Sequence, residues 1–189
     1  MIKLSEIIKQ SSSILDQKVI VFPTDTVYGI GTKWNDLVGI EKIYEIKKRD
    51  GRKPIAILVS NINQILSYIE INYEHSLNLL EKYWPGAVTF IFKKKDNFDY
   101  PTDTIAFRMP NSKVALSLID HFGPLATTSV NLSGEKEINN PEEIEETFNN
   151  KIDYIISDNE EFCMVSSTIV DLTTNEVKII RQGTVIINE

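Results

Sequence analysis

Residues 19–31 read Val-Ile-Val-Phe-Pro-Thr-Asp-Thr-Val-Tyr-Gly-Ile-Gly. The apolar run 19–22 stops at Pro23, which is typical of a buried strand that enters a loop. The expected loop, residues 23–31, has hydroxyl groups and glycines that would let a small polar ligand approach closely. It matches neither a dinucleotide fingerprint, because the third glycine is lacking, nor a phosphate-binding loop. We therefore expect a ligand-binding loop here, and a tight turn capped by hydroxyls is the simpler alternative.

Helical and strand-like segments alternate early in the chain, and strand-like segments cluster late. Apolar spacing and stop signals predict helices near residues 5–16, from about Asp36, near 62–70 and 73–83, from Ser112, and after Pro141. Apolar runs predict strands near 19–22, 55–59, 87–92, 104–107, 125–130, 152–156, 167–172 and 177–181. The pattern predicts an α/β fold, a single domain over residues 1–189 on a twisted mixed open sheet with flanking helices.

The charge of the chain is unevenly distributed. The formal net charge of the 189 residues is −7, with a sequence pI near 5.0. Residues 135–161 contain 10 acidic and 2 basic side chains, so the rest of the chain has a net charge of +1. An acidic chain of this kind argues against a general polyanion-binding protein, but it allows a locally basic pocket.

Cysteine and histidine are rare in this chain. One cysteine, Cys163, excludes an internal disulfide, and two histidines do not make a zinc site with it. We expect Cys163 to be a small buried residue rather than a nucleophile. No apolar run approaches the roughly 18 residues of a membrane span, so we expect no membrane contact and a cytoplasmic location.

Five of the seven residues 47–53 are basic, and they include Arg49 and Arg52, two of only four arginines. Such a run is often only a solvated face. Here, however, it lies between a predicted helix end and a predicted buried strand, and the planar fork of arginine suits phosphate. Lys47 and Arg49, with Lys53 beside them, would neutralise a triphosphate.

The other two arginines, Arg108 and Arg181, each end a predicted strand. Arg108 is followed by a Met-Pro pair, which restricts the backbone and aims the side chain. Residues 127–134 alternate hydroxyl and amide side chains with apolar ones, and this puts Ser129 and Asn131 on the same face of an extended chain. These side chains are further candidates for ligand contact.

Taken together, these segments resemble the threonylcarbamoyl-AMP synthase family, the proteins with the YrdC-type fold, over roughly residues 5–185. The resemblance implies a YrdC/RibB-like fold in its short form, without the C-terminal domain of longer relatives. The motifs that carry it are Pro-Thr-Asp-Thr-Val-Tyr-Gly (23–29), Lys-Lys-Arg (47–49), Lys-Pro (53–54), Trp-Pro-Gly (84–86) with Thr89, Arg-Met-Pro (108–110), Ser-Val-Asn-Leu-Ser-Gly (129–134), Ser-Thr-Ile-Val-Asp (167–171) and Arg-Gln-Gly (181–183). Leu58 stands where some longer relatives have a histidine that contacts threonine.

The family resemblance implies an enzyme, a nucleotidyltransferase that condenses L-threonine, bicarbonate and ATP to threonylcarbamoyl-AMP and pyrophosphate. The product would serve the threonylcarbamoyladenosine modification of tRNA. The implied partners are tRNA-modifying proteins that accept the adenylate, together with a weak contact to tRNA or double-stranded RNA. Because the reactants are anionic, positioning and electrostatics would be the main tasks of the site. Mg²⁺ is expected with the nucleotide, held mostly by ATP and water.

The same resemblance assigns two sets of site residues. The expected catalytic pair is Lys47 and Arg49, and no residue is expected to bind a metal directly. The expected ATP-binding residues are Lys47, Arg49, Lys53, Ser129, Asn131 and Arg181. The expected L-threonine-binding residues, with Arg108 as partner of the carboxylate, are Thr26, Tyr28, Arg108 and Ser167.

Two other functions stay open from the sequence. One is a binding module for double-stranded RNA or ribosomal precursors, which would depend steeply on salt. The other is a carbamoyl-transfer domain like that of hydrogenase maturation factors. Those proteins carry acylphosphatase and zinc-finger parts, which 189 residues with one cysteine do not supply.

Overall fold

The computed structural model describes residues 1–51, 53–71, 74–148, 150–158 and 160–188. Within these residues, nine strands form one sheet in the order β7-β1-β2-β6-β3-β5-β4-β8-β9. The pairs β1/β7, β3/β5 and β4/β8 are parallel and the others are antiparallel, which confirms the predicted mixed α/β sheet. The strands are β1 (Ile20–Phe22), β2 (Gly29–Lys33), β3 (Ala56–Leu58), β4 (Val88–Lys93), β5 (Thr104–Arg108), β6 (Leu125–Ser129), β7 (Tyr154–Ile155), β8 (Thr168–Asp171) and β9 (Lys178–Arg181).

The helices flank this sheet. In the described residues they are α1 (Leu4–Ile7), the 3-10 helix η1 (Ser12–Leu15), α2 (Leu37–Lys47), α3 (Asn63–Leu66), α4 (Glu74–Tyr83), α5 (Lys113–Phe122) and α6 (Pro141–Phe148). The carboxylate of Asp36 accepts a hydrogen bond from Gly39 N–H at 3.0 Å, and Ser112 Oγ accepts one from Ala115 N–H at 3.0 Å. These caps explain why α2 and α5 begin where the sequence predicts. None of these helices is long and apolar enough to cross a membrane.

The predicted helix over residues 5–16 is not continuous. It is divided into α1 and η1, and a turn lies between them. Serines occupy positions 11–13, and serine favours caps and turns over helix interiors because its hydroxyl competes for backbone groups. Accordingly, Ser11 Oγ accepts a hydrogen bond from Ser13 N–H at 3.4 Å. The helix predicted near 62–70 is similarly short, since α3 has four residues.

The predicted loop over residues 23–31 is also shorter than expected, because Gly29 and Gly31 belong to β2. This strand pairs with β1 on one side and with β6 on the other. Glycine is needed at both positions, since an added Cβ would lie 2.7 Å from Thr127 Cγ2 at Gly29 and 2.7 Å from Thr127 Oγ1 at Gly31. The loop therefore consists of residues 23–28, and a paired strand holds it at each end.

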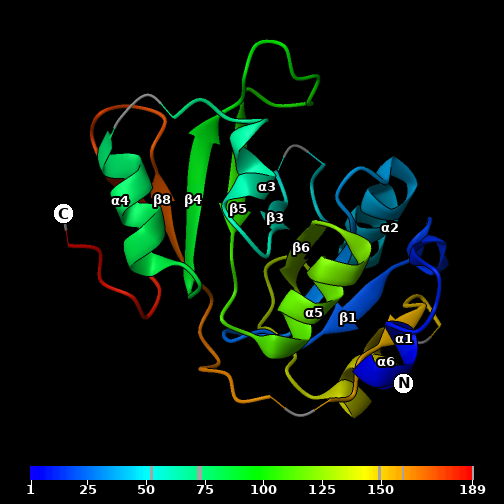
Figure 1. The fold of residues 1–189 in the computed structure, drawn as a ribbon. Helices are drawn as coiled ribbons and strands as arrows, with labels where there is room; N and C mark the ends of the chain where they lie inside the picture. The colour runs from blue at the N-terminus through cyan, green and yellow to red at the C-terminus, as the bar shows by residue number, and fades with distance from the viewer. Residues whose placement is uncertain (52, 72–73, 149, 159, 189) are drawn as a thin grey trace.

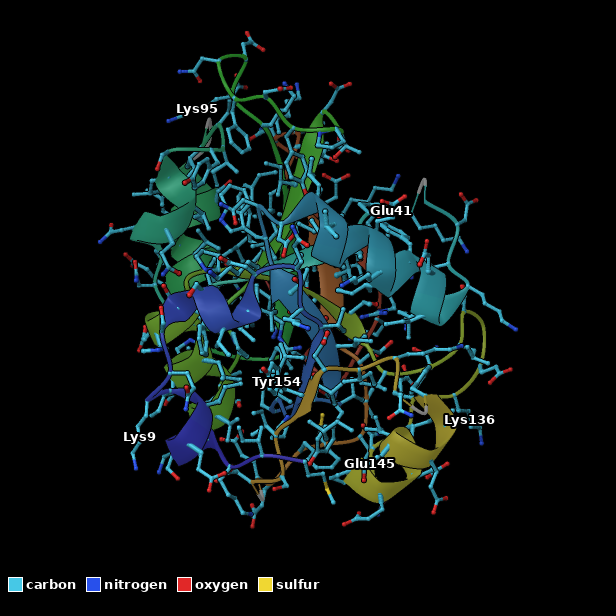
Figure 2. The ribbon with its side chains drawn as sticks, turned by 90° about the vertical axis from the view of Figure 1, so that its right-hand side faces the viewer. Lys9, Glu41, Lys95, Lys136, Glu145 and Tyr154 are labelled. Atoms are coloured by element: carbon cyan, nitrogen blue, oxygen red, sulfur yellow. The ribbon has the colours of Figure 1, made fainter. Side chains whose placement is uncertain are left out.

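Helices cover the two faces of the sheet unequally. On one face, Phe90 and Phe107 pack with α3 and α4, and Val21 and Ile30 pack with α2 and α6. On the other face, α5 packs on β1 and β6 together with α1 and η1. Figure 1 shows α4 beside β8 and β4, and α5 in front of β6 and β1 at the other end of the sheet. Figure 2 looks at the β7 edge near Tyr154, with α2 and α6 on one side of the edge and Lys9 on the other.

Small side chains occupy the middle of the face that α5 leaves open. Register places Ala56 opposite Thr127, and Ala106 of the neighbouring strand β5 points to the same side. An alanine or a threonine at these positions fills little space above the sheet, so the open face is hollowed where β3, β5 and β6 lie.

The core under α4 should be sensitive to loss of volume. Phe90 on β4 is fully buried, and its ring lies 5.7 Å from that of Trp84. We expect Phe90→Ala to lower the free energy of unfolding by about 3–5 kcal/mol, because it removes apolar contacts and leaves a cavity. Urea unfolding followed by circular dichroism measures this change. The matched control is Ile179→Ala at a side chain that is 44% exposed, and an equal loss there would contradict the assigned core.

Candidate active site

A cavity of about 360 Å³ lies on the open face of the sheet. Its lining includes Ala56 and Ala106, together with parts of the loop 23–28 and Gly29 at the start of β2. Leu58 also lines it. Strands far apart in the chain therefore meet at this cavity, as expected for a ligand site on a sheet with an open face.

The cavity brings together most of the predicted site residues. Lys47 and Asn131 are not among the lining residues; both are buried and hydrogen-bonded to Ser129. Lys53 is exposed and outside the lining, and Arg52 lies outside the described residues. The predicted residues that line the cavity are Thr26, Tyr28, Arg49, Arg108, Ser129, Ser167 and Arg181.

Arg108 is buried, with 6% of its surface exposed, and three segments hold its guanidinium. Nε–H donates to the carbonyl oxygen of Gly86 at 3.0 Å, and Nη1–H donates to Thr26 Oγ1 at 2.8 Å. Nη2–H donates to the carboxylate of Asp25. Burial lowers the pKa of Arg108 and Asp25 opposes this effect, so the ion pair compensates for lost hydration. Guanidinium has five N–H groups, and among the described residues the other two have no protein partner.

Asp25 is a site residue that the sequence analysis does not single out. Its side chain is 15% exposed and forms the ion pair with Arg108. Hydrogen bonds within the loop hold the backbone around it, since Thr24 Oγ1 donates to the carbonyl oxygen of Val27 at 2.7 Å and accepts from Thr26 N–H at 3.2 Å. One signal was present in the sequence: a single acid among hydroxyl residues directly after a buried strand needs a cationic partner.

Arg181 on β9 is held against β8. Its Nε–H and Nη2–H donate to the carbonyl oxygen of Ser167 at 3.1 and 2.9 Å, and Nη2–H also reaches Ser167 Oγ at 3.3 Å. Ser167 Oγ in turn shares a hydrogen bond with Thr89 Oγ1 at 2.8 Å. After Arg181 the chain passes close to Ser166, and glycine at position 183 allows this because it has no Cβ. An added Cβ there would lie 2.5 Å from the carbonyl oxygen of Ser166.

Lys47 is 1% exposed, and its ammonium group is satisfied by protein oxygens. It donates to the carbonyl oxygen of Ser129 and, at 2.8 Å each, to the carbonyl oxygen and Oδ1 of Asn131. Asn131 Oδ1 also accepts from Ser129 Oγ at 2.8 Å. Lys47 therefore holds the loop after β6, and through it the hydroxyl of Ser129, in place.

Arg49 reaches the cavity because α2 ends just before it. Lys48 adopts a left-handed conformation with φ of 49°, and Arg49 N–H donates to the carbonyl oxygen of Tyr44 at 2.9 Å. The guanidinium of Arg49 donates to the carbonyl oxygens of residues 53–54 at 3.3 and 3.1 Å. The basic segment is therefore more than a solvated face, since its first arginine lines the cavity.

Residues 160–166 lie on the connection from β7 to β8, which runs along the bottom of Figure 1. The N–H groups of residues 163–164 donate to the carbonyl oxygens of residues 25–26 at 3.2 and 2.9 Å. The expectation that Cys163 is buried is wrong, because this segment meets the loop through its backbone and leaves the cysteine exposed. Sequence periodicity carries no signal for such a contact.

The fold and the cavity define a mixed α/β domain with a cationic, hydroxyl-lined ligand cavity on an open sheet face. The chain belongs to the Sua5_yciO_yrdC family, because the model of that family, described as telomere recombination, matches residues 12–183. The resemblance seen in the sequence motifs is thereby confirmed.

Curated relatives match nearly the whole chain. Proteins named threonylcarbamoyl-AMP synthase from Pyrococcus abyssi and Bacillus subtilis are 32% identical over 175 residues and 31% identical over 183 residues. These matches cover 90% and 93% of this chain but 52% and 53% of the relatives, so the chain spans about half their length. A relative from Methanocaldococcus jannaschii is 32% identical over 187 residues, with 97% of this chain and 87% of the relative covered.

Solved structures agree with this assignment. The P. abyssi Sua5 structure, complexed with L-threonine, has a TM-score of 0.87 and 31% identity, covering 97% of this chain and 55% of that one. E. coli YciO has a TM-score of 0.83 and 26% identity, covering 95% and 90%. Full-length HypF has a TM-score of 0.78 at 19% identity, covering 97% and 29%, which is a likeness of fold alone.

The buried ammonium of Lys47 should make stability depend on pH. Burial, and then the charge of Arg49, lower the pKa of Lys47 from 10.5 to about 8, against an opposing effect of Glu137. Between these two pH values the unfolded chain binds more protons than the folded one, so raising the pH stabilises the fold. From pH 7.5 to 10, we expect the free energy of unfolding to rise by about 2 kcal/mol relative to that of Lys47→Met.

Urea unfolding at each pH measures this difference. Lys9→Met is the control, since Lys9 is exposed, and it should keep the pH profile of the wild-type protein. Parallel profiles of the wild-type protein and Lys47→Met would contradict the burial of a charged Lys47.

Proposed function

We propose that this chain is an L-threonylcarbamoyladenylate synthase. It condenses L-threonine, bicarbonate and ATP to threonylcarbamoyl-AMP, pyrophosphate and water, for the threonylcarbamoyladenosine modification of tRNA. The observation that carries the proposal is one cavity lined by Arg49, Arg108 and Arg181 together with hydroxyl groups. The chain has this cavity on a sheet that matches the L-threonine complex of P. abyssi Sua5 over 97% of its length.

The reaction forms two bonds in succession, and both form within one site. The threonine amine forms a C–N bond with the carbon of bicarbonate while a C–O bond breaks, and the released oxygen leaves as water with protons from the amine and from bicarbonate. A carbamate oxygen then attacks the α-phosphorus of ATP while the bond to pyrophosphate breaks. Both partners of the second step are anions. A site with fixed cations lowers their repulsion and holds them in line, which requires no covalent enzyme intermediate.

The ATP subsite of the proposal is built on Arg49, Ser129 and Arg181, because all three line the cavity. Lys47 and Asn131 take part from behind the lining by holding Ser129, and Lys53 extends the positive charge at the surface. In this proposal Arg49 is the catalytic cation that faces the phosphates. Lys47, predicted to be catalytic as well, acts as a positioning residue.

The L-threonine subsite of the proposal is built on Arg108 with Thr26, Tyr28 and Ser167 around it. The two free N–H groups of Arg108 suit one carboxylate. Thr26 and Ser167 bring hydroxyl groups to the same cavity, and Tyr28 is 4% exposed and forms part of its wall. Burial raises the pKa of Tyr28, so its hydroxyl stays protonated and can donate a hydrogen bond at neutral pH.

Mg²⁺ would travel with the nucleotide. No group of three or more histidine, cysteine, aspartate or glutamate side chains suitable for a metal occurs among the described residues. The cations and hydroxyls of the cavity fit the phosphates rather than a metal, so ATP oxygens and water would be its main ligands.

The partners in this proposal are proteins that accept the adenylate for tRNA modification, and the location is the cytoplasm. A module that binds double-stranded RNA is not favoured, because Lys47 is buried and Arg49 is bonded within the cavity wall. A weak contact with tRNA stays a prediction that a binding assay at two salt concentrations tests.

The direct test is product analysis. We expect the protein to convert ATP to pyrophosphate only when L-threonine and bicarbonate are both present, and mass spectrometry should detect threonylcarbamoyl-AMP. Omission of each substrate in turn provides the controls. A folded sample that forms no threonylcarbamoyl-AMP would exclude the proposed synthase activity.

The second test separates an enzyme from a general polyanion binder. Arg49→Ala should lower kcat by about a hundredfold or more, because a fixed cation at the phosphates is lost. The matched control, Lys48→Asn, removes the neighbouring exposed charge and keeps a residue that tolerates the left-handed backbone. It should keep kcat within about twofold. Equal losses in both variants would indicate a diffuse electrostatic surface instead.

A further inference from the structure

Asp25 differs from the other charged groups of the site because it pairs with Arg108 but is not among the residues that line the cavity. The side chains of Arg108 and Asp25 are 8% and 15% exposed. The carbonyl oxygen of Asp25 also accepts from Cys163 N–H at 3.2 Å, so its backbone is held as well. Arg108 therefore lines the cavity as part of a pair whose net charge is zero, with two N–H groups that have no protein partner among the described residues.

Arg181 lines the same cavity, but its hydrogen-bond partners differ from those of Arg108. Its guanidinium donates to the carbonyl and hydroxyl oxygens of Ser167, which carry no net charge. Burial lowers the pKa of Arg181, and the negative charge of Glu137 opposes this effect through space, without a hydrogen bond to the guanidinium. Arg108 and Arg181 line the same cavity, so their positive charges repel each other. Burial is the main cause that lowers the pKa of Arg108, and the charge of Arg181 adds to it. One arginine of the cavity is thus neutralised by a contacting carboxylate, and the other retains its positive charge toward the ligand.

This difference matters because the proposed substrates carry different charges. A zwitterionic amino acid has one carboxylate and no net charge, whereas ATP and pyrophosphate carry several negative charges. A neutral ion pair still offers hydrogen bonds to a carboxylate, but it has little attraction for a polyanion. Without the carboxylate of Asp25, Arg108 and Arg181 would form one continuous cationic surface.

We propose that Asp25 is a specificity-determining positioning residue: by neutralising and orienting Arg108, it reserves that subsite for the amino-acid carboxylate and keeps phosphate groups on the Arg49 and Arg181 side. The inference rests on the proposed function. It adds that the separation of the two subsites depends on a carboxylate that itself contacts neither substrate.

The test compares anion binding in the wild-type protein and Asp25→Asn. Asparagine keeps an oxygen that accepts from Arg108 and removes the charge. With pyrophosphate as the probe, isothermal titration calorimetry should show about tenfold tighter binding to Asp25→Asn than to the wild-type protein. In the variant, pyrophosphate should also become competitive with L-threonine, while L-threonine still binds.

A matched control replaces an aspartate of a different ion pair. Asp153 pairs with Lys18 at 2.9 Å outside the cavity, so Asp153→Asn should leave pyrophosphate and L-threonine binding unchanged. Pyrophosphate binding by Asp25→Asn at the wild-type affinity, or noncompetitive with L-threonine, would overturn the inference.

Two further measurements cover a variant that folds poorly. Pyrophosphate should raise the melting temperature of Asp25→Asn more than that of the wild-type protein, because it compensates the positive charge of Arg108 that has lost its carboxylate partner. An equal rise in both proteins contradicts the proposal. Asp25→Glu retains the negative charge, so its affinity for pyrophosphate should stay as weak as that of the wild-type protein. If pyrophosphate competes with L-threonine in this variant, the proposal is contradicted. A wild-type protein that does not bind L-threonine would instead count against the proposed function itself.

Discussion

Two buried cations, Lys47 and Arg108, constrain the rest of the site, because each must replace its lost hydration with oxygen partners from the protein. Arg108 takes these partners from the loop after β1 and from the turn before β4. Lys47 takes them from the end of β6 and the loop that follows. The loops that face the cavity are thus held by hydrogen bonds to Lys47 and Arg108. Neither charged group can move without losing these bonds.

The cavity exists because the sheet is covered by helices on one face and only partly on the other. Aromatic and branched residues such as Phe90 and Ile57 fill the face under α3 and α4. On the opposite side, Ala56 and Ala106 leave room above the strands, and α5 lies at the β1 and β6 end. A strand alternates between its two faces, so one short stretch of sequence can build a packed core and the floor of a ligand site at once.

Local signals predicted most elements of this fold. Asp36 and Ser112 begin helices as expected, because helix capping depends on residues only three positions apart. The predictions fail where the apolar spacing of a segment competes with hydroxyl side chains nearby or with pairing to a distant strand. Serines 11–13 keep the first helix from continuing to residue 16, and Gly29 joins a strand because β2 pairs with β1 and β6.

The sequence by itself determined which side chains are available for the site: the arginines at strand ends, the hydroxyl-rich loop after β1 and the Ser-x-Asn stretch after β6. Only the tertiary structure decided which of them face the cavity. It placed Lys47 behind the cavity lining, brought Asp25 to Arg108 across 83 positions of the chain, and left Cys163 at the surface. The physical reason is that periodicity reports burial on a residue's own strand or helix, whereas the pairing of buried charges depends on strand order and register, which arise only when distant segments pack together.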